Sequence, residues 1–243
     1  MLQIIIGTQR NQFLAERVLE YSIRKNASGP VDVRAVHQDR ASPGGTKFGF
    51  VRFMIPSLCD FRGKAIYFDA DQVVLGDVHE LADQLHAPHA VGLVRKIEGT
   101  FGGEPVAERN ETSVMVLDCG RLLDWDPATM FDHVVPNATK KLAPGEMRYR
   151  DFMRLAWLDP TAIEEIPARW NHYNVVREDT SLVHFSHVRD QPWKKPRHAF
   201  SPFWKEWLRE TIASGTLRKS DVLKAIARGH LHPSFLGVLR QAR

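Results

Sequence analysis

The sequence contains two carboxylates separated by one residue, Asp69 and Asp71, at a position where chemistry is expected. They follow the apolar stretch Lys64–Phe68, which has the composition of a buried strand. In an open α/β sheet, ligands bind outside the carboxyl ends of the strands, and these two residues would lie at such an end. Paired carboxylates can hold a divalent cation, and their hard oxygen ligands suit Mn²⁺ or Mg²⁺, which also bind phosphate oxygens.

A second D-x-D pair shows that this motif is informative only through its position. Asp124 and Asp126 have the same spacing, but they precede Pro127 and do not directly follow an apolar strand. We interpret them as turn and cap residues, because aspartate and proline favour turns. The metal site is therefore predicted from Asp69 and Asp71.

A histidine is the third candidate ligand. His184 lies in the short apolar run Leu182–Phe185, which predicts a strand. A buried histidine is more often a hydrogen-bonded core residue than a metal ligand, so the sequence leaves both interpretations open. Basic and amide side chains follow, among them Gln191 and Lys194, and such groups suit the binding of a diphosphate.

Around these residues the sequence resembles glycosyltransferase family 8, which includes glycogenin, galactinol synthase and bacterial lipooligosaccharide galactosyltransferases. The segment Tyr67–Leu81 resembles the D-x-D segment of that family. Four further elements match in order and spacing: Arg52, Arg109–Cys119, Arg169–Asn171 and His184–Trp193. The elements together cover roughly residues 1 to 195, and their common order makes chance a poor explanation.

The resemblance implies a GT-A fold and the transfer of a hexose from a nucleotide sugar, most simply a UDP-sugar, to an acceptor hydroxyl with retention of configuration. It also implies an Mn²⁺ or Mg²⁺ ion held by Asp69, Asp71 and His184, which would stabilise the departing nucleoside diphosphate as a Lewis acid. The resemblance does not identify the acceptor. We expect a saccharide or a lipid-linked acceptor, as in cell-envelope or polysaccharide synthesis, and the lipid-linked alternative is indicated by the basic C-terminal part of the chain.

The resemblance further implies roles for individual residues. The residues that would contact the donor and its diphosphate are Gly7, Thr8, Asn11, Arg52, Asp69, Ser113, Gln191 and Lys194. The residues that would act in catalysis are Asp71, Asn110 and Asp151. Of the first group, Gly7, Thr8 and Asn11 would line the base and ribose.

Two site positions depart from the family pattern. Gln191 stands where the family has a lysine, so the charge of that lysine must come from Arg189, Lys194 or Lys195 or be absent. Phe152 stands where a glutamine often accompanies the acidic residue, so only the carboxylate of Asp151 carries over. An equally good interpretation of Asp151 is a charge at a helix N-terminus, stabilised by the helix dipole.

The elements that must position these residues alternate between apolar strands and amphipathic helices. This alternation predicts an α/β fold with a mostly parallel central sheet flanked by helices. The expected strands are Gln3–Gly7, Val31–Ala35, Lys64–Phe68, Ala90–Val94, Thr112–Leu117 and Leu182–Phe185. The expected helices are Gln12–Asn26, Phe48–Leu58 with an interruption at Pro56, Val78–Leu85, Gly120–Leu123, Trp204–Ser214, Ser220–Arg228 and Pro233–Arg243, with a loop at Ala41–Gly45.

Composition bounds the class of protein. With 243 residues, 43% hydrophobic and 26% charged, the chain has the composition of a folded domain and not of a disordered segment. No apolar run approaches the length of about 20 residues that a membrane span needs. Cys59 and Cys119 are too few for a disulfide framework, so a reducing, cytoplasmic location is expected.

The basic character of the chain belongs to its C-terminal part. From Lys194 onward there are 11 Lys/Arg against 3 Asp/Glu, whereas the preceding residues carry 22 against 26. We therefore predict a catalytic domain over residues 1–193 and a basic helical extension over 194–243. Such an extension favours anionic partners, above all lipid headgroups at the inner membrane face, with nucleic acid the least favoured; it could equally be a solubilising segment without a partner. Deletion of residues 194–243 is expected to weaken vesicle binding more than donor hydrolysis.

Two other functions are compatible with parts of the sequence. A nucleotidyltransferase also uses a carboxylate-held metal, but its first loop is Gly-rich and basic, whereas Gly7–Asn11 has one glycine and one arginine. A catalytically silent binding module could act through the basic extension. Gln191 and Phe152 keep that alternative open, and the retained metal-type residues argue against it.

The tryptophans also have two interpretations. They could stack on sugar rings, or they could anchor the core and the C-terminal helices, and the second is favoured because large aromatic residues are first of all buried residues. The residues concerned are Trp170, Trp193, Trp204 and Trp207.

Overall fold

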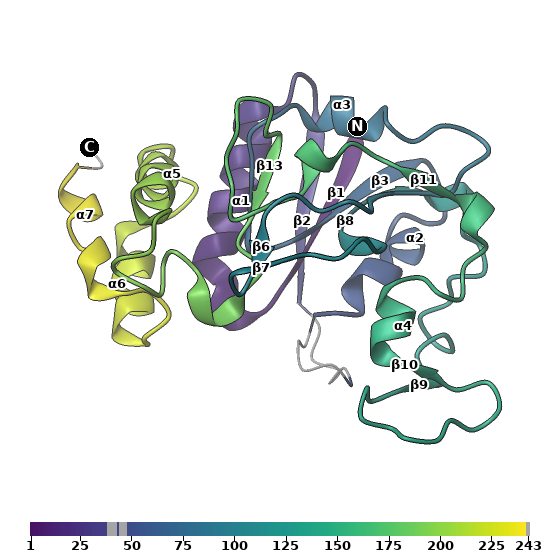
Figure 1. Ribbon diagram of the computed structural model, residues 1–243. Coiled ribbons are helices and arrows are strands. Elements are labelled where there is room, and N and C mark those ends of the chain that lie inside the picture. The colour runs from purple at the N-terminus through teal and green to yellow at the C-terminus, as the bar shows by residue number, and fades with distance from the viewer. Residues whose placement is uncertain (38–42, 44–47, 242–243) are drawn as a thin grey trace.

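A six-stranded sheet forms the centre of the molecule in the computed structural model, which describes residues 1–37, 43 and 48–241 (Figure 1). Its strands, in spatial order, are β11 (Ile163–Glu165), β5 (Val91–Val94), β8 (Glu111–Asp118), β3 (Lys64–Asp69), β1 (Leu2–Thr8) and β2 (Val31–His37). Strand β8 runs antiparallel to both of its neighbours, and the other pairs are parallel. The predicted mostly parallel sheet is confirmed.

Alternation along the strands gives the sheet two buried faces. Ile4 and Ile6 of β1 lie on one face, whereas Ile5 lies on the other, as the period of two in a strand requires. Helices α1 (Phe13–Asn26) and α3 (Val78–Ala82) pack on the first face. The short helices α2 (Ile55–Leu58) and α4 (Tyr149–Met153) and a group of aromatic residues cover the second.

A smaller three-stranded sheet lies beside the end of β3. It consists of β12 (His172–Tyr173), β13 (Leu182–His184) and β4 (Gln72–Val74). Strand β13 pairs antiparallel with β4, which places His184 opposite Gln72. The turn after β3 therefore passes the chain from the large sheet to the small one, and the residues of that turn lie between the two.

Short ribbons and turns complete the fold. The two-stranded ribbons pair β6 (Thr100–Phe101) with β7 (Glu104–Pro105) and β9 (Val134–Val135) with β10 (Met147–Arg148). The 3₁₀ turns are η1 (Arg10–Gln12), η2 (Val51–Phe53), η3 (Cys119–Arg121), η4 (Pro160–Ala162), η5 (Ala168–Trp170), η6 (Val188–Asp190) and η7 (Pro233–Phe235).

The C-terminal helices pack against the side of α1 that faces away from the sheet (Figure 1). These helices are α5 (Ser201–Ala213), α6 (Lys219–Ala227) and α7 (Val238–Gln241). They share one buried cluster with α1, whose members include Leu14, Val18, Leu208, Val222 and Val238. The extension from residue 194 thus covers apolar surface of α1, and Glu210 of α5 adds an ion pair to Lys25 of α1 at the edge of this contact. The boundary at residue 193 stays a prediction.

The tryptophans act mainly as core anchors. Trp170, Trp193 and Trp204 are each at most 2% exposed. Trp193 and Trp204 lie against each other with ring centroids 5.0 Å apart, and Trp207 packs edge-on against Tyr21 of α1. The favoured interpretation of these residues is confirmed.

Leu208 tests how firmly the extension is built into the fold. Leu208→Ala is expected to lower the free energy of unfolding by about 3 kcal/mol, because a fully buried leucine side chain is removed from the contact with α1. Leu223→Ala is the matched control, since this residue of α6 is 49% exposed. Denaturant unfolding measures both. Equal small losses in the two variants would mean that the extension is docked only loosely.

Three predicted helices were wrong in detail. The segment Phe48–Leu58 forms η2 and then α2, and Pro56 stands in the first turn of α2, where a missing N–H costs nothing. Pro56 therefore begins a helix and does not interrupt one. Gly120–Leu123 is replaced by the 3₁₀ turn η3, and Pro233–Arg243 divides into η7 and α7. The predicted loop Ala41–Gly45 lies outside the described residues except for Pro43.

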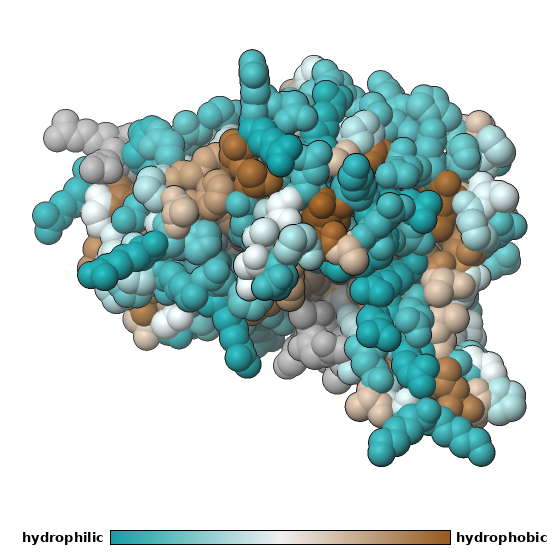
Figure 2. All heavy atoms as spheres, viewed as in Figure 1, coloured by the Kyte–Doolittle hydropathy of each residue, from teal (hydrophilic) through white to brown (hydrophobic). Residues whose placement is uncertain are grey.

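The surface is largely polar. Figure 2 shows that hydrophilic residues dominate the visible face and that hydrophobic residues gather there only in small separate groups. Within the described part of the chain, no helix combines the length and the apolar character needed to cross a membrane.

Candidate metal and donor site

The two sheets bring the predicted metal ligands together. Asp69 ends β3, and Asp71 lies in the turn that leads into β4. The backbone N–H of Phe185 donates to the carbonyl oxygen of Asp71 at 2.9 Å, which holds the end of β13 against this turn. As a result, Asp69, Asp71 and His184 each offer one ligand atom, and these atoms lie within 4.8 Å of one another.

Hydrogen bonds on the side of the His184 ring that faces away from Asp71 fix the orientation of the ring. Asn171 donates from Nδ2 to Ser113 Oγ at 3.0 Å, and this bond turns its Oδ1 toward His184 Nδ1, 3.1 Å away. The amide oxygen can only accept, so Nδ1 is the ring nitrogen that carries the proton. The free electron pair of Nε2 then points toward Asp71. A partner on the second ring nitrogen is the usual arrangement behind a metal-ligating histidine.

Of the two Asp71 carboxylate oxygens, one accepts a hydrogen bond from a described residue and the other does not. Gln191 donates from Nε2 to Oδ2 at 2.9 Å. Oδ1 is buried and lies 3.2 Å from His184 Nε2, yet it has no hydrogen-bond partner among the described residues. Burial lowers the pKa of His184, but the Asp71 carboxylate outweighs this effect and raises the pKa above its ordinary value. A site that attracts a proton in this way also fits a divalent cation, so the residues present fit a metal ion.

Asp69 is held by two donors on the same oxygen. Arg52 donates from Nη2 at 2.7 Å and the Tyr67 hydroxyl donates at 2.5 Å, both to Oδ1. Burial raises the pKa of Asp69, Arg52 lowers it and Asp71 raises it, with a net increase. No hydrogen bond to the second oxygen of Asp69 is found among the described residues.

Gly7 makes the approach of Tyr67 possible. A Cβ atom at this position would lie 2.2 Å from the Tyr67 hydroxyl, so a larger residue would displace the ring from Asp69. The structure thus gives Gly7 a packing role next to the site. Its predicted contact with the donor base stays a prediction.

Arg52 is an internal residue of the site. It is 5% exposed, and its Nη1 donates to Thr112 Oγ1 at 2.7 Å while Nη2 binds Asp69. Burial alone would lower the pKa of Arg52. The Asp69 carboxylate outweighs this effect and raises the pKa above its ordinary value, so the guanidinium stays charged. Arg52 also forms part of the wall of a cavity of about 320 Å³. Arg52 therefore lies beside Asp69, and its predicted contact with the donor diphosphate stays a prediction.

Asn110 and Asp151 are separate from the three candidate metal ligands Asp69, Asp71 and His184, which we call the metal triad. Asn110 lines the same cavity as Arg52 and donates from Nδ2 to the carbonyl oxygen of Arg154 at 2.9 Å. Asp151 lies in the first turn of α4 and is 3.7 Å from Arg150, which agrees with a helix N-terminal charge. Phe152 points away into the core, where it stacks on Trp157 and is 5% exposed.

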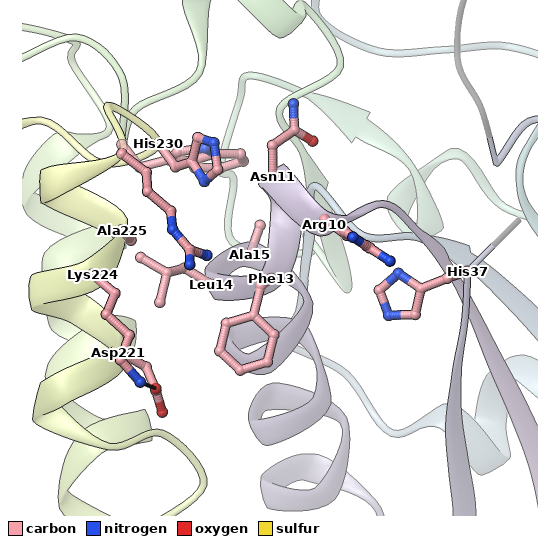
Figure 3. A pocket seen from close by; sticks show the side chains of 12 residues that line it. Arg10, Asn11, Phe13, Leu14, Ala15, His37, Asp221, Lys224, Ala225 and His230 are labelled. Carbon is pink, nitrogen blue, oxygen red and sulfur yellow. Dashed lines mark hydrogen bonds and ion pairs between the residues drawn. The ribbon is translucent and has the colours of Figure 1, made fainter. Parts of the chain in front are cut away.

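A second cavity, of about 380 Å³, lies between the N-terminus of α1 and helix α6 (Figure 3). Asn11 lines it, as do Arg10 and His37 on one side of α1 and Lys224 on the α6 side. Trp193 forms part of the wall.

The segment that contains Trp193 connects this second cavity to the metal triad. Gln191 contacts Asp71, and Lys194 donates to the carbonyl oxygen of Val188 at 2.9 Å. Burial lowers the pKa of Lys194, and the Asp71 carboxylate partly opposes this decrease. Thr8 is fully buried behind the loop between β1 and α1.

Glu16 is a buried acid beneath the same loop. Burial raises its pKa, and Arg17 and His37, at 3.5 and 3.6 Å, only partly oppose this increase. A carboxyl with a raised pKa in the folded state costs stability at every pH above that pKa. Glu16→Gln is therefore expected to raise the melting temperature at alkaline pH.

The difference in melting temperature between Glu16→Gln and the wild type should shrink as the pH falls through the raised pKa. Wild-type Glu16 is then protonated in the folded state, so its side chain is neutral like that of glutamine. Thermal unfolding over a pH series measures this. A lower melting temperature of the variant at alkaline pH would mean that the ion pairs of Glu16 outweigh its burial.

Two supporting residues were not assigned by sequence reasoning. Tyr67 and Asn171 belong to segments that resemble the family, and in the structure they contact Asp69 and His184 and hold them in place. The Trp-Asn pair Trp170–Asn171 was the available signal for the second of these, since an amide beside a candidate ligand is a natural hydrogen-bond partner.

Solved glycosyltransferases share this architecture. The bifunctional glycosyltransferase WbbM superposes with a TM-score of 0.60 and 14% identity over 85% of this chain and 49% of its own, so this chain spans about half of that protein. The galactosyltransferase LgtC, solved with donor and acceptor sugar analogues, superposes with a TM-score of 0.58 and 12% identity over 89% of this chain and 100% of its own. GlyE of Streptococcus pneumoniae TIGR4 gives a TM-score of 0.58 and 15% identity over 96% of this chain and 64% of its own.

The chain therefore has the GT-A glycosyltransferase fold, as the sequence predicted. By sequence it is similar to Protein CDI of Arabidopsis thaliana, with 28% identity over 220 residues that cover 79% of each protein. No family model matches the chain.

Proposed function

We propose that this protein is a metal-dependent glycosyltransferase related to family 8, which transfers a hexose from a UDP-sugar to a hydroxyl of a saccharide or lipid-linked acceptor with retention of configuration. The observation that carries the proposal is the buried Asp71–His184 pair, oriented by Asn171 at the carboxyl edge of a GT-A sheet. Fold alone would not define the reaction, because function depends on the site.

Asp69, Asp71 and His184 would hold Mn²⁺ or Mg²⁺, and such an ion, when bound, supplies Lewis-acid stabilisation of the departing diphosphate. Gln191 keeps the Asp71 carboxylate in place by its hydrogen bond to Oδ2. Lys194 takes over the charge of the lysine that the family has at position 191, because its ammonium lies in the field of Asp71.

The two cavities suggest how a donor would lie. The base and ribose would occupy the cavity beside Asn11 and Trp193, and the hexose would extend toward Arg52 and Asn110. Ser113 supports His184 through Asn171 and would reach the donor only indirectly. Asp151 would approach the acceptor from α4. We keep its predicted catalytic role as part of this proposal.

A product analysis tests the reaction class. The protein is incubated with UDP-glucose, UDP-galactose and mixed saccharide acceptors, and in a parallel reaction with UTP and glucose 1-phosphate. Each reaction contains Mn²⁺ or EDTA, and the products are identified by mass spectrometry. Release of UDP together with free or transferred hexose, only with Mn²⁺, is expected. Release of pyrophosphate from a nucleoside triphosphate and a sugar phosphate would instead identify a nucleotidyltransferase, and no turnover of either kind would favour the silent binding module.

The basic extension belongs to the same proposal as a surface for an anionic membrane that presents a lipid-linked acceptor. Its basic residues stand on the outside of helices that pack on α1 through their apolar faces. Because the extension is docked on α1, surface substitutions such as Lys219→Gln are a sharper test of vesicle binding than deletion of residues 194–243. Lys219 is exposed, and it has no ion pair among the described residues.

A further inference from the structure

The cavity of about 320 Å³ beside Arg52 carries an unusual set of charges. It is bounded by the strand β8 and the helix α4, and Arg52 in its wall reaches the candidate metal ligand Asp69 through a hydrogen bond of 2.7 Å. Its remaining charged residues are Arg109, Glu111, Arg150 and Arg154. Four guanidinium groups thus meet one carboxylate in a space that adjoins the candidate donor site.

Two of the four arginines are already neutralised. Arg52 binds Asp69 at 2.7 Å. Arg109 donates to Glu111 Oε2 from Nε at 3.1 Å and from Nη2 at 3.0 Å, so the single carboxylate of the cavity is engaged there. Neither pair leaves negative charge for the other two arginines.

Arg150 and Arg154 supply the surplus positive charge. Arg150 is exposed, and its nearest carboxylate is Asp151 at 3.7 Å. Arg154 is partly buried, and its side chain has no ion pair among the described residues. Burial lowers the pKa of Arg154, and Arg109 and Arg150 lower it further, because three like charges lie close together. An anion in this cavity would relieve that repulsion.

The lining is also suited to a sugar ring. Phe101 presents a ring that is 48% exposed, and Asn110 and Thr112 add polar groups beside it. An aromatic face with a few placed polar groups is typical of sites that hold small polar ligands in one orientation. Guanidinium groups bind carboxylates and phosphates with paired, charge-assisted hydrogen bonds.

We propose that this cavity binds an anionic saccharide, a sugar that bears a carboxylate or a phosphate, through Arg150 and Arg154. The inference rests on the proposed transferase function, because it names the substrate class of the same site. The anionic group can belong to the donor hexose, as in a uronate, or to the acceptor. A charge-assisted hydrogen bond of the usual strength corresponds to a preference of about tenfold to a hundredfold over the neutral sugar.

Calorimetry with defined probes separates the two sources. If the anion is on the donor, wild-type protein with Mn²⁺ binds UDP-glucuronate at least about tenfold more tightly than UDP-glucose, and Arg154→Gln removes this difference. If it is on the acceptor, the two donors bind alike, but protein saturated with UDP and Mn²⁺ binds glucose 6-phosphate or glucuronate and not glucose, and Arg154→Gln abolishes that binding.

Arg150→Gln serves as the second variant, because an exposed side chain can be replaced without disturbing the fold. Arg121→Gln is the matched control, since Arg121 lies outside the cavity and pairs with Asp118. The inference is overturned if neither acidic probe is preferred, or if Arg150→Gln and Arg154→Gln weaken the binding of UDP itself, which would place the diphosphate in this cavity. Failure of the proposed function is distinct, because UDP would then not bind to wild-type protein at all.

Discussion

Asp71→Asn is expected to reduce the rate of donor turnover about 10³-fold or more, since a cation-held diphosphate leaving group accounts for several kcal/mol of barrier lowering. The substitution replaces an anionic oxygen by an amide at the position where Asp71 Oδ1 lies 3.2 Å from His184 Nε2. Asparagine keeps the size of the side chain and one oxygen acceptor for Gln191. The fold should therefore be retained while the affinity for the cation falls. Release of UDP from UDP-glucose in the presence of Mn²⁺ measures the effect.

Asp124→Asn is the matched control for this prediction. It makes the same chemical change in the second D-x-D pair, at an exposed residue. Its turnover should equal that of the wild type. If Asp71→Asn keeps more than about a tenth of the wild-type rate, transition-state stabilisation at this carboxylate is too small to support the proposed site.

Arg52→Met is expected to lower the free energy of unfolding by about 3–5 kcal/mol in the presence of EDTA. The variant keeps an apolar side chain of similar length, but it leaves Asp69 largely buried with only Tyr67 as a donor. An uncompensated buried charge is the costly outcome when one partner of an internal ion pair is removed. The deficit should shrink at lower pH, because burial raises the pKa of Asp69 and the carboxyl can then take up a proton.

The double variant Arg52→Met/Asp69→Asn shows whether the cost arises from the pair. It should recover most of the lost stability, since the buried charge is removed along with its partner. Denaturant unfolding of the two single variants and the double variant completes the cycle. A loss of less than about 1 kcal/mol in Arg52→Met would mean that the pair behaves like a solvated surface ion pair.

The sequence predicted which three residues come together, partly from their places in the chain and partly from the family resemblance. Asp69 and Asp71 follow an apolar run, so the rule that sites form at the carboxyl edge of a sheet applies to them directly. His184 lies within another apolar run, and the residues alone left a core role and a ligand role open for it. What brings the histidine to the aspartates is the antiparallel pairing of β13 with β4. That pairing involves three-residue strands, which have no clear pattern of their own in the sequence.

The supporting contacts depended on three-dimensional proximity that no local pattern encodes. Tyr67 reaches Asp69 only because Gly7 on the neighbouring strand lacks a side chain. Asn171 is 13 positions from His184 along the chain and meets it through the pairing of β12 with β13. The charge count of the C-terminal extension gives no information on where it packs. Its apolar residues determine that, and their contacts with α1 required the structure.

The central claim is tested most directly by titrating UDP into the protein by calorimetry, with and without Mn²⁺, for the wild type and Asp71→Ala. GDP and ADP serve as comparison nucleotides. The proposed site predicts binding of UDP that requires Mn²⁺ and that Asp71→Ala abolishes. Absence of binding for all three nucleotides, or binding that is indifferent to both the metal and Asp71, would contradict the account.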